Sequence, residues 1–232
     1  MKFSLVIPCY NEAANLPLLL ERCQMLLSKA DVEVILVDNG STDETPQVLA
    51  KLLPSYVGCR SVRVDVNNGY GYGILSGLRA AKGEILGWTH ADLQTDPHDA
   101  LDALDLFSQF GSELFVKGKR YGRPLADQLF TLGMSIFETL LLRKTFWDIN
   151  AQPTMFSRSF FESWGSVPDD FSLDLYIYYL AKTQGLKVVR LPVAFGKRAH
   201  GVSHWNVNWN AKWKFIRRTI DFSLQLKKNM MQ

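Results

Sequence analysis

Short apolar runs alternate with stretches of helical periodicity through the first half of this 232-residue chain. Four of these runs have the length and composition of buried strands. They cover residues 3–7, 32–37, 61–66 and 84–88. Between them, apolar residues recur at helical spacing, as in the segment 16–27. Such an order builds a mostly parallel sheet with helices on both faces. The sequence therefore predicts an α/β fold with a Rossmann-like, mostly parallel central sheet.

The rhythm changes in the second half of the chain. The expected elements there are a strand at 114–116, a long apolar helix ending at 142, a short strand near 155–156, a helix over 173–183 and one or two strands over 187–195. We expect these elements to complete the same sheet and to form the second side of a cleft. Because no linker or repeat divides the chain, we predict one domain over residues 1–204, followed by a helical tail over 205–232.

Composition excludes several classes of protein. A chain that is 47% hydrophobic and 21% charged resembles a globular domain rather than a disordered one. Its three cysteines form no CxxC pair, which indicates reduced thiols in a cytosolic setting and argues against a zinc site. The first residues enter a strand pattern without a signal peptide. The longest apolar run, 129–142, is shorter than a bilayer requires and contains Glu138, so we expect no membrane span.

The C-terminal tail is strongly basic. From Lys197 onwards the chain has eight basic residues and one acidic residue, a net charge of +7, while the remainder carries −4. Six apolar residues of the tail recur at helical spacing, namely Trp205, Trp209, Trp213, Ile216, Ile220 and Leu224. A basic helix with tryptophans suits a peripheral membrane contact through residues 205–228, and docking on the core or on a partner subunit is the alternative. Nucleic-acid binding is not expected, because the basic residues belong to no groove-binding motif.

The segment after the fourth predicted strand has the pattern of a ligand site. His90, Asp92 and Gln94 alternate along an extended stretch, so their side chains point to the same side. They follow the carboxyl end of a strand, where open α/β sheets bind ligands. Imidazole and carboxylate groups at this spacing can converge on one cation. The alternative is a polar turn in which Thr95 or Asp96 caps the next helix.

Three more polar loops follow the other predicted strands. These loops cover residues 8–12, 38–41 and 67–73. Because all four loops belong to the same edge of a parallel sheet, they indicate a ligand site there. The glycines of the third loop lack the GxGxxG spacing of a dinucleotide site. We expect them to allow close approach of the backbone to a sugar or a phosphate, with a flexible turn as the alternative.

The order and spacing of several motifs resemble glycosyltransferase family 2. The first half contains "LVIPCYNE", "VDNGSTDET", "NNGYGYGILSGLRAAKGE" and "THADLQTDP". The similarity continues through "VKGKRYGR" and "DINAQPTMFSR" and covers residues 3–205. Dolichyl-phosphate mannose synthase-like members are the most similar subgroup. The resemblance implies an inverting hexosyltransferase with the GT-A fold, in which residues 1–120 bind the nucleotide sugar and residues 121–204 form the acceptor half.

The resemblance also implies roles for residues at matching positions. The nucleotide sugar would be bound by Pro8, Tyr10, Glu12, Asp38, Asn39, Gly71, Ala91, Asp92, Arg198 and Ser203. A divalent cation would be held against the diphosphate by Asp92, His90 and Gln94. Arg120 would face the diphosphate or an acceptor phosphate. Independently of the resemblance, a hydroxyl acceptor would need a general base, and Asp174 is the first candidate, with capping of the helix that it opens as the alternative.

Two positions depart from the family's pattern. Asn39 stands where the family usually has aspartate, so a carboxylate contact with the base would become an amide contact. His90 replaces the first aspartate of the usual DxD motif. Because a neutral imidazole suits Mn²⁺ better than Mg²⁺, we expect Mn²⁺ as the favoured cation. A protonated His90 that hydrogen-bonds to the diphosphate is the alternative.

These observations lead to one hypothesis and two alternatives. The hypothesis is a cytoplasmic enzyme, peripheral on the inner face of the cytoplasmic membrane, that transfers a sugar from a UDP- or GDP-linked donor to a polyprenyl phosphate or a lipid-linked glycan. A lipid phosphate is already anionic and needs no base. The first alternative is transfer to a polysaccharide or another hydroxyl acceptor. The second, motivated by His90, is a catalytically silent member that only binds nucleotide sugars.

Overall fold

The computed structural model describes residues 2–28, 31–201 and 209–229. Its elements follow in the order β1 (Phe3–Cys9), α1 (Leu16–Leu27), β2 (Val32–Asn39), α2 (Thr45–Leu52), η1 (Leu53–Ser55), β3 (Cys59–Val64), α3 (Tyr70–Ala80), β4 (Ile85–Trp88), α4 (Asp99–Phe110), η2 (Gly111–Glu113), β5 (Leu114–Tyr121), α5 (Leu125–Leu142), β6 (Thr154–Ser157), α6 (Arg158–Glu162), α7 (Leu173–Thr183), β7 (Lys187–Ala194) and α8 (Trp209–Asn229). The chain divides into two compact units. One comprises Met1–Gly122 with Asn150–His200, and the other comprises Arg123–Ile149 with Gly201–Gln232.

The first unit is built on one seven-stranded sheet, with the strand order β3-β2-β1-β4-β6-β5-β7. The strands are parallel except for β6, which runs antiparallel to β4 and β5. β1 pairs on both sides, with Phe3 opposite Val32 of β2 and Ile85 of β4. The chain order runs from β1 towards β2 and β3 on one side, while β4 lies on the other. Open α/β sheets bind ligands beyond the carboxyl ends of the strands at such a reversal.

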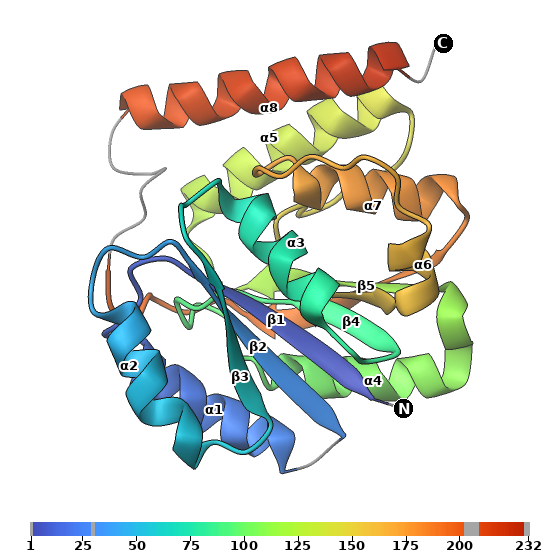
Figure 1. Cartoon of the computed structure of the whole chain (residues 1–232). Coiled ribbons are helices and arrows are strands. Elements are labelled where there is room, and N and C mark those ends of the chain that lie inside the picture. Colours follow the sequence, from blue (N-terminus) through green and yellow to red (C-terminus); the bar gives the residue numbers. More distant parts are fainter. Residues whose placement is uncertain (1, 29–30, 202–208, 230–232) are drawn as a thin grey trace. The chain divides into compact units, whose positions relative to one another are not determined.

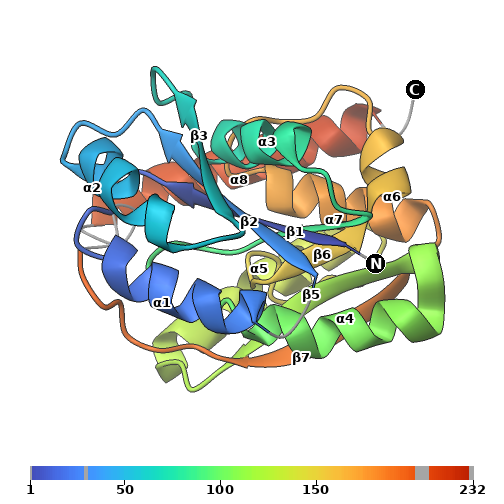
Figure 2. The same ribbon diagram turned by 60° about the horizontal axis from the view of Figure 1, so that its bottom comes forward.

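Helices cover both faces of this sheet (Figures 1 and 2). α1, α2 and α4 pack on the face to which Leu5 and Ile7 of β1 point, and Phe107 of α4 belongs to the same core. α3 packs on the opposite face, where a Cβ at Gly77 would lie 2.3 Å from the Val6 side chain. Burial on both faces explains why the strands read as nearly continuous apolar runs in the sequence.

Most of the predicted elements are confirmed. The α/β class and the mostly parallel sheet are present, and α7 spans the predicted residues 173–183. The segment after residue 187 is one strand, β7. β5 continues to Tyr121, five residues further than predicted. α6 was not predicted, because its five residues are too few to show periodicity.

The second unit contains α5 and α8, which pack on each other. On α5, four side chains that are 50–77% exposed recur at helical spacing, namely Leu125, Leu129, Ile136 and Leu140. Ser135 and Glu138 are buried. By length and composition α5 is apolar enough to cross a membrane. The prediction that no segment reaches the length of a span is therefore wrong, because the helix begins at Leu125 and not at residue 129. An exposed apolar stripe with buried polar residues elsewhere on the helix is an amphipathic pattern.

The predicted helical tail is present as α8, although part of its apolar stripe cannot be placed. Trp205 lies outside the described residues. Trp213 and Leu224 are exposed, whereas Ser223 and Leu226 are buried. The described part of the stripe is thus open to solvent at Trp213 and Leu224.

A buried carboxyl group joins α5 to α8. Ser223 Oγ lies 2.7 Å from Glu138 Oε1 and 2.8 Å from the Thr219 carbonyl oxygen. Burial raises the pKa of Glu138 to about 7, although the hydrogen bond from Ser223 lowers it. Because one hydroxyl proton cannot serve both oxygens at once, a protonated Glu138 that donates to Ser223 lets Ser223 donate to Thr219. The folded chain therefore holds the proton on Glu138 more tightly than the unfolded chain does.

Glu138→Gln should remove a pH-dependent loss of stability. An unfolded glutamate has a pKa of about 4.3, so the free energy of unfolding should fall as the pH rises from about 4 to 7. The gain from Glu138→Gln in urea denaturation should be larger at pH 8 than at pH 5, by about 2–3 kcal/mol. Glu21→Gln, an exposed change on α1, is the matched control and should show no such difference. Equal gains from Glu138→Gln at both pH values would contradict the assignment.

Candidate functional site

The loops after β1 and β2 are joined by hydrogen bonds at the carboxyl edge of the sheet. The Asn11 amide donates to Ser41 Oγ at 3.1 Å, and the Glu12 amide donates to Thr45 Oγ1 at 2.9 Å. In the other direction, Asn11 Oδ1 accepts from the Thr42 amide at 2.8 Å. Two of the four predicted polar loops therefore lie side by side.

Within the first loop, Glu12 lies in the electrostatic field of the 90–92 segment. Burial raises the pKa of Glu12, the Asn15 side chain lowers it by donating a hydrogen bond, and the charges of Asp92 and Arg198 act on it in opposite directions. Pro8 belongs to β1 and is partly exposed, and Tyr10 is 39% exposed. The first loop thus carries an exposed aromatic ring and a carboxyl group that interacts electrostatically with Asp92.

Asp38 and Asn39 end β2 and have different surroundings. Asp38 is buried, accepts a hydrogen bond from the Ser41 amide and pairs with Arg63 Nη1, each at 3.0 Å. Asn39 is also buried, and its Nδ2 donates to the Gly69 carbonyl at 2.9 Å. Its Oδ1 has no hydrogen-bond partner within the part of the chain that the structure describes. Asp38 therefore holds its own loop, and Asn39 ties that loop to Gly69 in the loop after β3.

Gly71 makes a close contact with the chain's own backbone, whereas the sequence predicted a contact with a sugar or a phosphate. A Cβ at Gly71 would lie 2.5 Å from the Asp169 carbonyl carbon, and the Tyr72 amide donates to the Asp169 carbonyl at 2.6 Å. The close backbone approach is present, but the approaching group is the chain's own segment 169–170. The glycine belongs to the first turn of α3 rather than to a flexible turn.

His90, Ala91 and Asp92 begin two residues after the end of β4. Their side chains lie in different surroundings. Ala91 is buried in the hydrophobic core and is not positioned at the surface of the site. The ring of the half-buried His90 stacks on Tyr70, with ring centroids 5.7 Å apart. Burial lowers the pKa of His90, and the charges of Asp92 and Asp174 offset this only in part. A neutral imidazole keeps an unshared electron pair on one nitrogen, which favours the ligand interpretation over the imidazolium alternative.

Asp92 pairs with Arg198, as Arg198 Nη2 lies 2.9 Å from Asp92 Oδ2. The loop that follows β7 and contains Arg198, here called the late basic loop, is fixed beside this pair. The Gly196 amide of this loop donates to the Gln94 carbonyl at 2.8 Å. Gln94 Nε2 donates back to the Gly196 carbonyl at 3.2 Å. The side-chain amide nitrogen of Gln94 therefore fastens this loop to the segment after β4. Ser203, the other predicted residue of the loop, lies outside the described residues.

Arg120 is on β5, and Asp174 is on α7. The Arg120 guanidinium lies 5.1 Å from the centre of the Phe195 ring, and its charge lowers the pKa of His90, which places it in the field of the site. Asp174 is buried in the first turn of α7. Its Oδ1 lies 2.8 Å from Lys117 Nζ and 2.9 Å from Gln152 Nε2.

Three residues of this region received no role from the sequence: Tyr70, Lys117 and Gln152. Lys117 is fully buried although it is charged, and Gln152 is buried as well. A buried lysine needs a carboxylate nearby, so the "VKGKR" motif within a strand gave a signal that an acidic partner had to exist. Only the fold identifies that partner as Asp174.

The donor set fits a cation that arrives with a diphosphate. Among the described residues, no three His, Cys, Asp or Glu side chains converge on one point. His90 and Asp92 supply one imidazole nitrogen and one carboxylate. A divalent cation of this type is commonly bound through one or two protein groups together with substrate phosphates and water. The residues present therefore fit a substrate-linked cation and not a closed structural metal site.

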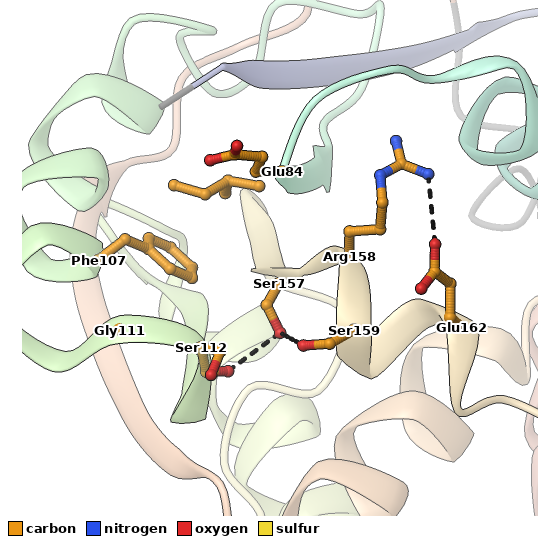
Figure 3. Close-up of a pocket in the computed structure, with 9 residues that line it drawn as sticks. Glu84, Phe107, Gly111, Ser112, Ser157, Arg158, Ser159 and Glu162 are labelled. Atoms are coloured by element: carbon orange, nitrogen blue, oxygen red, sulfur yellow. Dashed lines mark hydrogen bonds and ion pairs between the residues drawn. The ribbon is translucent and has the colours of Figure 1, made fainter.

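A separate pocket of about 340 Å³ lies at the amino ends of β4 and β5 (Figure 3). Its lining polar groups mostly bond to the chain itself. Ser157 Oγ donates to the Ser112 carbonyl at 3.0 Å, and Arg158 lies 4.0 Å from Glu162. The pocket is at the edge of the sheet opposite to the loops described above, and its charged lining residues are Glu84, Arg158 and Glu162.

Comparison with known proteins gives a family and several relatives. The model for "Glycosyl transferase family 2" matches residues 4–164. An undecaprenyl-phosphate 4-deoxy-4-formamido-L-arabinose transferase from Pseudomonas fluorescens (strain Pf0-1) is 39% identical over 102 residues, which are 41% of this chain and 29% of the relative. A dolichol-phosphate mannosyltransferase from Pyrococcus furiosus is 29% identical over 211 residues, which are 88% of this chain and 59% of that relative. The chain thus spans less than two thirds of either relative.

Two solved structures share the fold. Glucosyl-3-phosphoglycerate synthase from Mycobacterium tuberculosis, in complex with Mn²⁺, UDP and glucosyl-3-phosphoglycerate, gives a TM-score of 0.73 at 20% identity, covering 97% of this chain and 79% of that one. A mannosyltransferase from Pyrobaculum calidifontis, in complex with GDP-Man and Mn²⁺, gives 0.63 at 20% identity, covering 86% and 58%. These likenesses confirm the predicted GT-A fold.

Replacing the imidazole by a carboxylate should change the preference between cations. His90→Asp offers oxygen ligands, so the affinity for Mg²⁺ relative to Mn²⁺ should rise. Asp92→Ala should weaken the affinity for either cation on the order of 10- to 100-fold. The measurement is the cation-dependent shift in melting temperature in the presence of UDP or GDP. Asp102→Asn, an exposed change on α4, is the control and should alter neither affinity. An unchanged shift in Asp92→Ala would remove Asp92 from the cation site.

Proposed function

Because the chain belongs to glycosyl transferase family 2, we propose that it transfers one sugar, with inversion, from a nucleoside-diphosphate sugar to a polyprenyl phosphate. One arrangement carries the proposal. His90, Asp92 and Arg198 gather beyond β4, beside the reversal of strand order, where a diphosphate and its cation can be held. Asp174, the candidate base, already has Lys117 and Gln152 on one oxygen. This combination favours an acceptor that needs no base.

The nucleoside would lie over the loops after β1 and β2. The exposed Tyr10 ring offers a surface for stacking, and Pro8 and Glu12 border the same loop. Asn39 lies beneath this surface, because its Oδ1 is buried. We propose a UDP- or GDP-linked donor because the two solved structures with this fold contain UDP and GDP-Man.

The reaction breaks the bond between the anomeric carbon and the diphosphate oxygen. Negative charge builds on that oxygen, and stabilising it is usually the largest contribution to such catalysis. A bound divalent cation would supply Lewis-acid stabilisation there. Arg198 and Arg120 carry fixed positive charge in the same region. The acceptor oxygen attacks from the opposite face, which inverts the anomeric centre.

We assign the cation site to His90 and Asp92, with Mn²⁺ preferred over Mg²⁺. The two solved structures with this fold contain Mn²⁺ together with a nucleotide or a nucleotide sugar, which supports a divalent cation. The imidazole nitrogen supports the preference, because Mg²⁺ demands oxygen ligands more strictly than Mn²⁺ does.

The relatives support a polyprenyl phosphate as the acceptor. They are named as transferases to undecaprenyl phosphate and dolichol phosphate, whose terminal oxygens are anionic and need no deprotonation. The second candidate is transfer to a hydroxyl acceptor, and the position of Asp174 within the field of His90 favours it. Asp174 would then act as the general base.

Transfer assays with paired substitutions separate these acceptors. Lys117→Met with Asp174→Asn removes the carboxylate without leaving a buried ammonium group unpaired. With undecaprenyl phosphate and the UDP- or GDP-sugar that binds, this double variant should keep its rate within about tenfold, because no base is required. With an oligosaccharide acceptor, loss of a general base should cost on the order of 10²-fold or more. The single variant Asp174→Asn reports the cost of the unpaired lysine.

Three outcomes would change the proposal. Wild-type transfer to an oligosaccharide and not to undecaprenyl phosphate would favour the second candidate. A loss of 10²-fold with the phosphate acceptor in the folded double variant would contradict acceptor activation without a base. Nucleotide-sugar binding without release of nucleoside diphosphate would indicate a catalytically silent protein.

We further propose that the chain works at the inner face of the cytoplasmic membrane. The exposed stripe of α5 offers apolar surface, and Trp213 of α8 is 67% exposed. The tail supplies basic residues, each of which is worth about 1 kcal/mol near an anionic surface. Interfacial tryptophan and leucine add a contribution that salt does not screen. This combination supports a peripheral contact in which α5 takes part as well as residues 205–228.

Sedimentation with liposomes tests the membrane contact. Binding to anionic vesicles should weaken as salt rises and should not vanish. Leu129→Ser with Leu140→Ser and Trp213→Ala should release the protein while nucleotide binding is retained. Met25→Ser, on an exposed position of α1, is the matched control. Undiminished binding of the triple variant to anionic vesicles would exclude this surface.

A further inference from the structure

Tyr70 connects the candidate cation site to a buried polar cluster. It is the first residue of α3, and its ring stacks on the His90 imidazole at 5.7 Å with an angle of 29° between the planes. The same ring stacks on Phe171 at 4.8 Å and 11°. Two planar neighbours restrict the rotation of the Tyr70 ring, and the restricted ring in turn limits the orientation of His90.

The hydroxyl end of Tyr70 is fixed as well. Its oxygen lies 3.4 Å from Gln152 Nε2 and hydrogen-bonds to the Asp174 carboxylate. Burial and the charge of Asp174 raise the pKa of Tyr70, so the hydroxyl stays protonated. It can therefore donate a hydrogen bond to the carboxylate. The ring is therefore held at one end by stacking and at the other by hydrogen bonds.

The groups that hold this hydroxyl are themselves immobilised. Asp174 Oδ1 lies 2.8 Å from Lys117 Nζ and 2.9 Å from Gln152 Nε2. Lys117 Nζ also donates to Thr154 Oγ1 at 2.8 Å, and Thr154 Oγ1 donates to Gln152 Oε1 at 2.8 Å. All four residues are almost completely buried. Since a buried ion pair without its partner is costly, this cluster has one stable arrangement.

A histidine needs such orientation more than an aspartate does. A carboxylate offers two oxygens with several lone pairs, so it can hold a cation over a range of side-chain angles. A neutral imidazole offers one unshared pair, which lies in the plane of the ring. A cation contact through His90 therefore depends on the direction in which the ring plane is held.

We propose that Tyr70 is a positioning residue for His90, with its ring setting the plane of the imidazole and the Lys117–Asp174–Gln152 cluster holding Tyr70 in place. The inference rests on the proposed function, because it requires that His90 contacts the cation. It assigns Asp174 a role through Tyr70 rather than in proton abstraction.

Binding of Mn²⁺ in the presence of saturating UDP or GDP, measured by electron paramagnetic resonance, tests the inference without any turnover. Tyr70→Leu should weaken Mn²⁺ binding about tenfold, as His90→Ala should, because groups that orient a metal ligand typically contribute 10- to 100-fold. The double variant should bind no more weakly than His90→Ala. Tyr70→Phe keeps the stacked ring but loses the hydroxyl that the cluster holds, so its Mn²⁺ binding should lie between that of Tyr70→Leu and that of the wild type. Tyr72→Leu, two residues along α3, is the matched control and should have no effect.

The outcomes distinguish this inference from the function on which it rests. Additive losses in the double variant, or unchanged Mn²⁺ binding in Tyr70→Leu when His90→Ala binds weakly, would overturn the positioning role alone. Unchanged binding in His90→Ala would overturn the cation contact and the positioning role together. Melting temperatures establish that each variant is folded. If Tyr70→Leu is not, Tyr70→Met keeps most of the side-chain volume without a ring plane, and the same results are expected of it.

Discussion

β1 lies between two parallel neighbours, β2 and β4, and the order of the strands reverses around it. Because of this reversal, the loops after β1 and β4 emerge at the same edge of the sheet, beside each other. Asp92 stands just beyond β4, and its pairing with Arg198 brings the late basic loop to the same point. Glu12, from the loop after β1, lies within the field of both. Residues far apart in the sequence thus meet because of the strand order.

Two ion pairs at this edge have different characters. The side chains of Lys117 and Asp174 are 1% and 2% exposed, and removing one partner would leave a buried charge, which typically costs about 3–5 kcal/mol. The Arg198 side chain, paired with Asp92, is 28% exposed, so water or another cation can replace the guanidinium at lower cost. The first pair is suited to hold a framework in one arrangement. The second is suited to exchange, since Asp92 can take a divalent cation while Arg198 turns to a phosphate.

The sequence was sufficient to predict the sheet and the edge at which the candidate site lies. The periodicity of the apolar residues predicted the order of strands and helices. The polar residues after the strands predicted which loops form the candidate site. The prediction of β5 ended at Val116 because the next residue is charged, yet the strand continues because Lys117 is neutralised by Asp174. Similarly, Asp127 interrupts the apolar run of α5 without interrupting the helix. Gly71 is a third case, since its neighbour is the distant segment 169–170. The errors at β5 and Gly71 come from contacts between residues far apart in the chain, which no local pattern contains. The error at α5 is local, because an acidic residue is favourable in the first turn of a helix.

The central claim is that His90 and Asp92 use a divalent cation to hold a nucleoside diphosphate. Calorimetric titration of the wild-type protein with UDP and with GDP, in Mn²⁺, in Mg²⁺ and in EDTA, tests it most directly. For the nucleotide that binds, Mn²⁺ should increase the affinity by about tenfold or more over EDTA, which corresponds to about 1.4 kcal/mol, and Mg²⁺ should increase it less. Equal affinity in Mn²⁺ and in EDTA would contradict the claim, because the charge of the diphosphate would then be met by protein groups such as Arg198 and Arg120 alone.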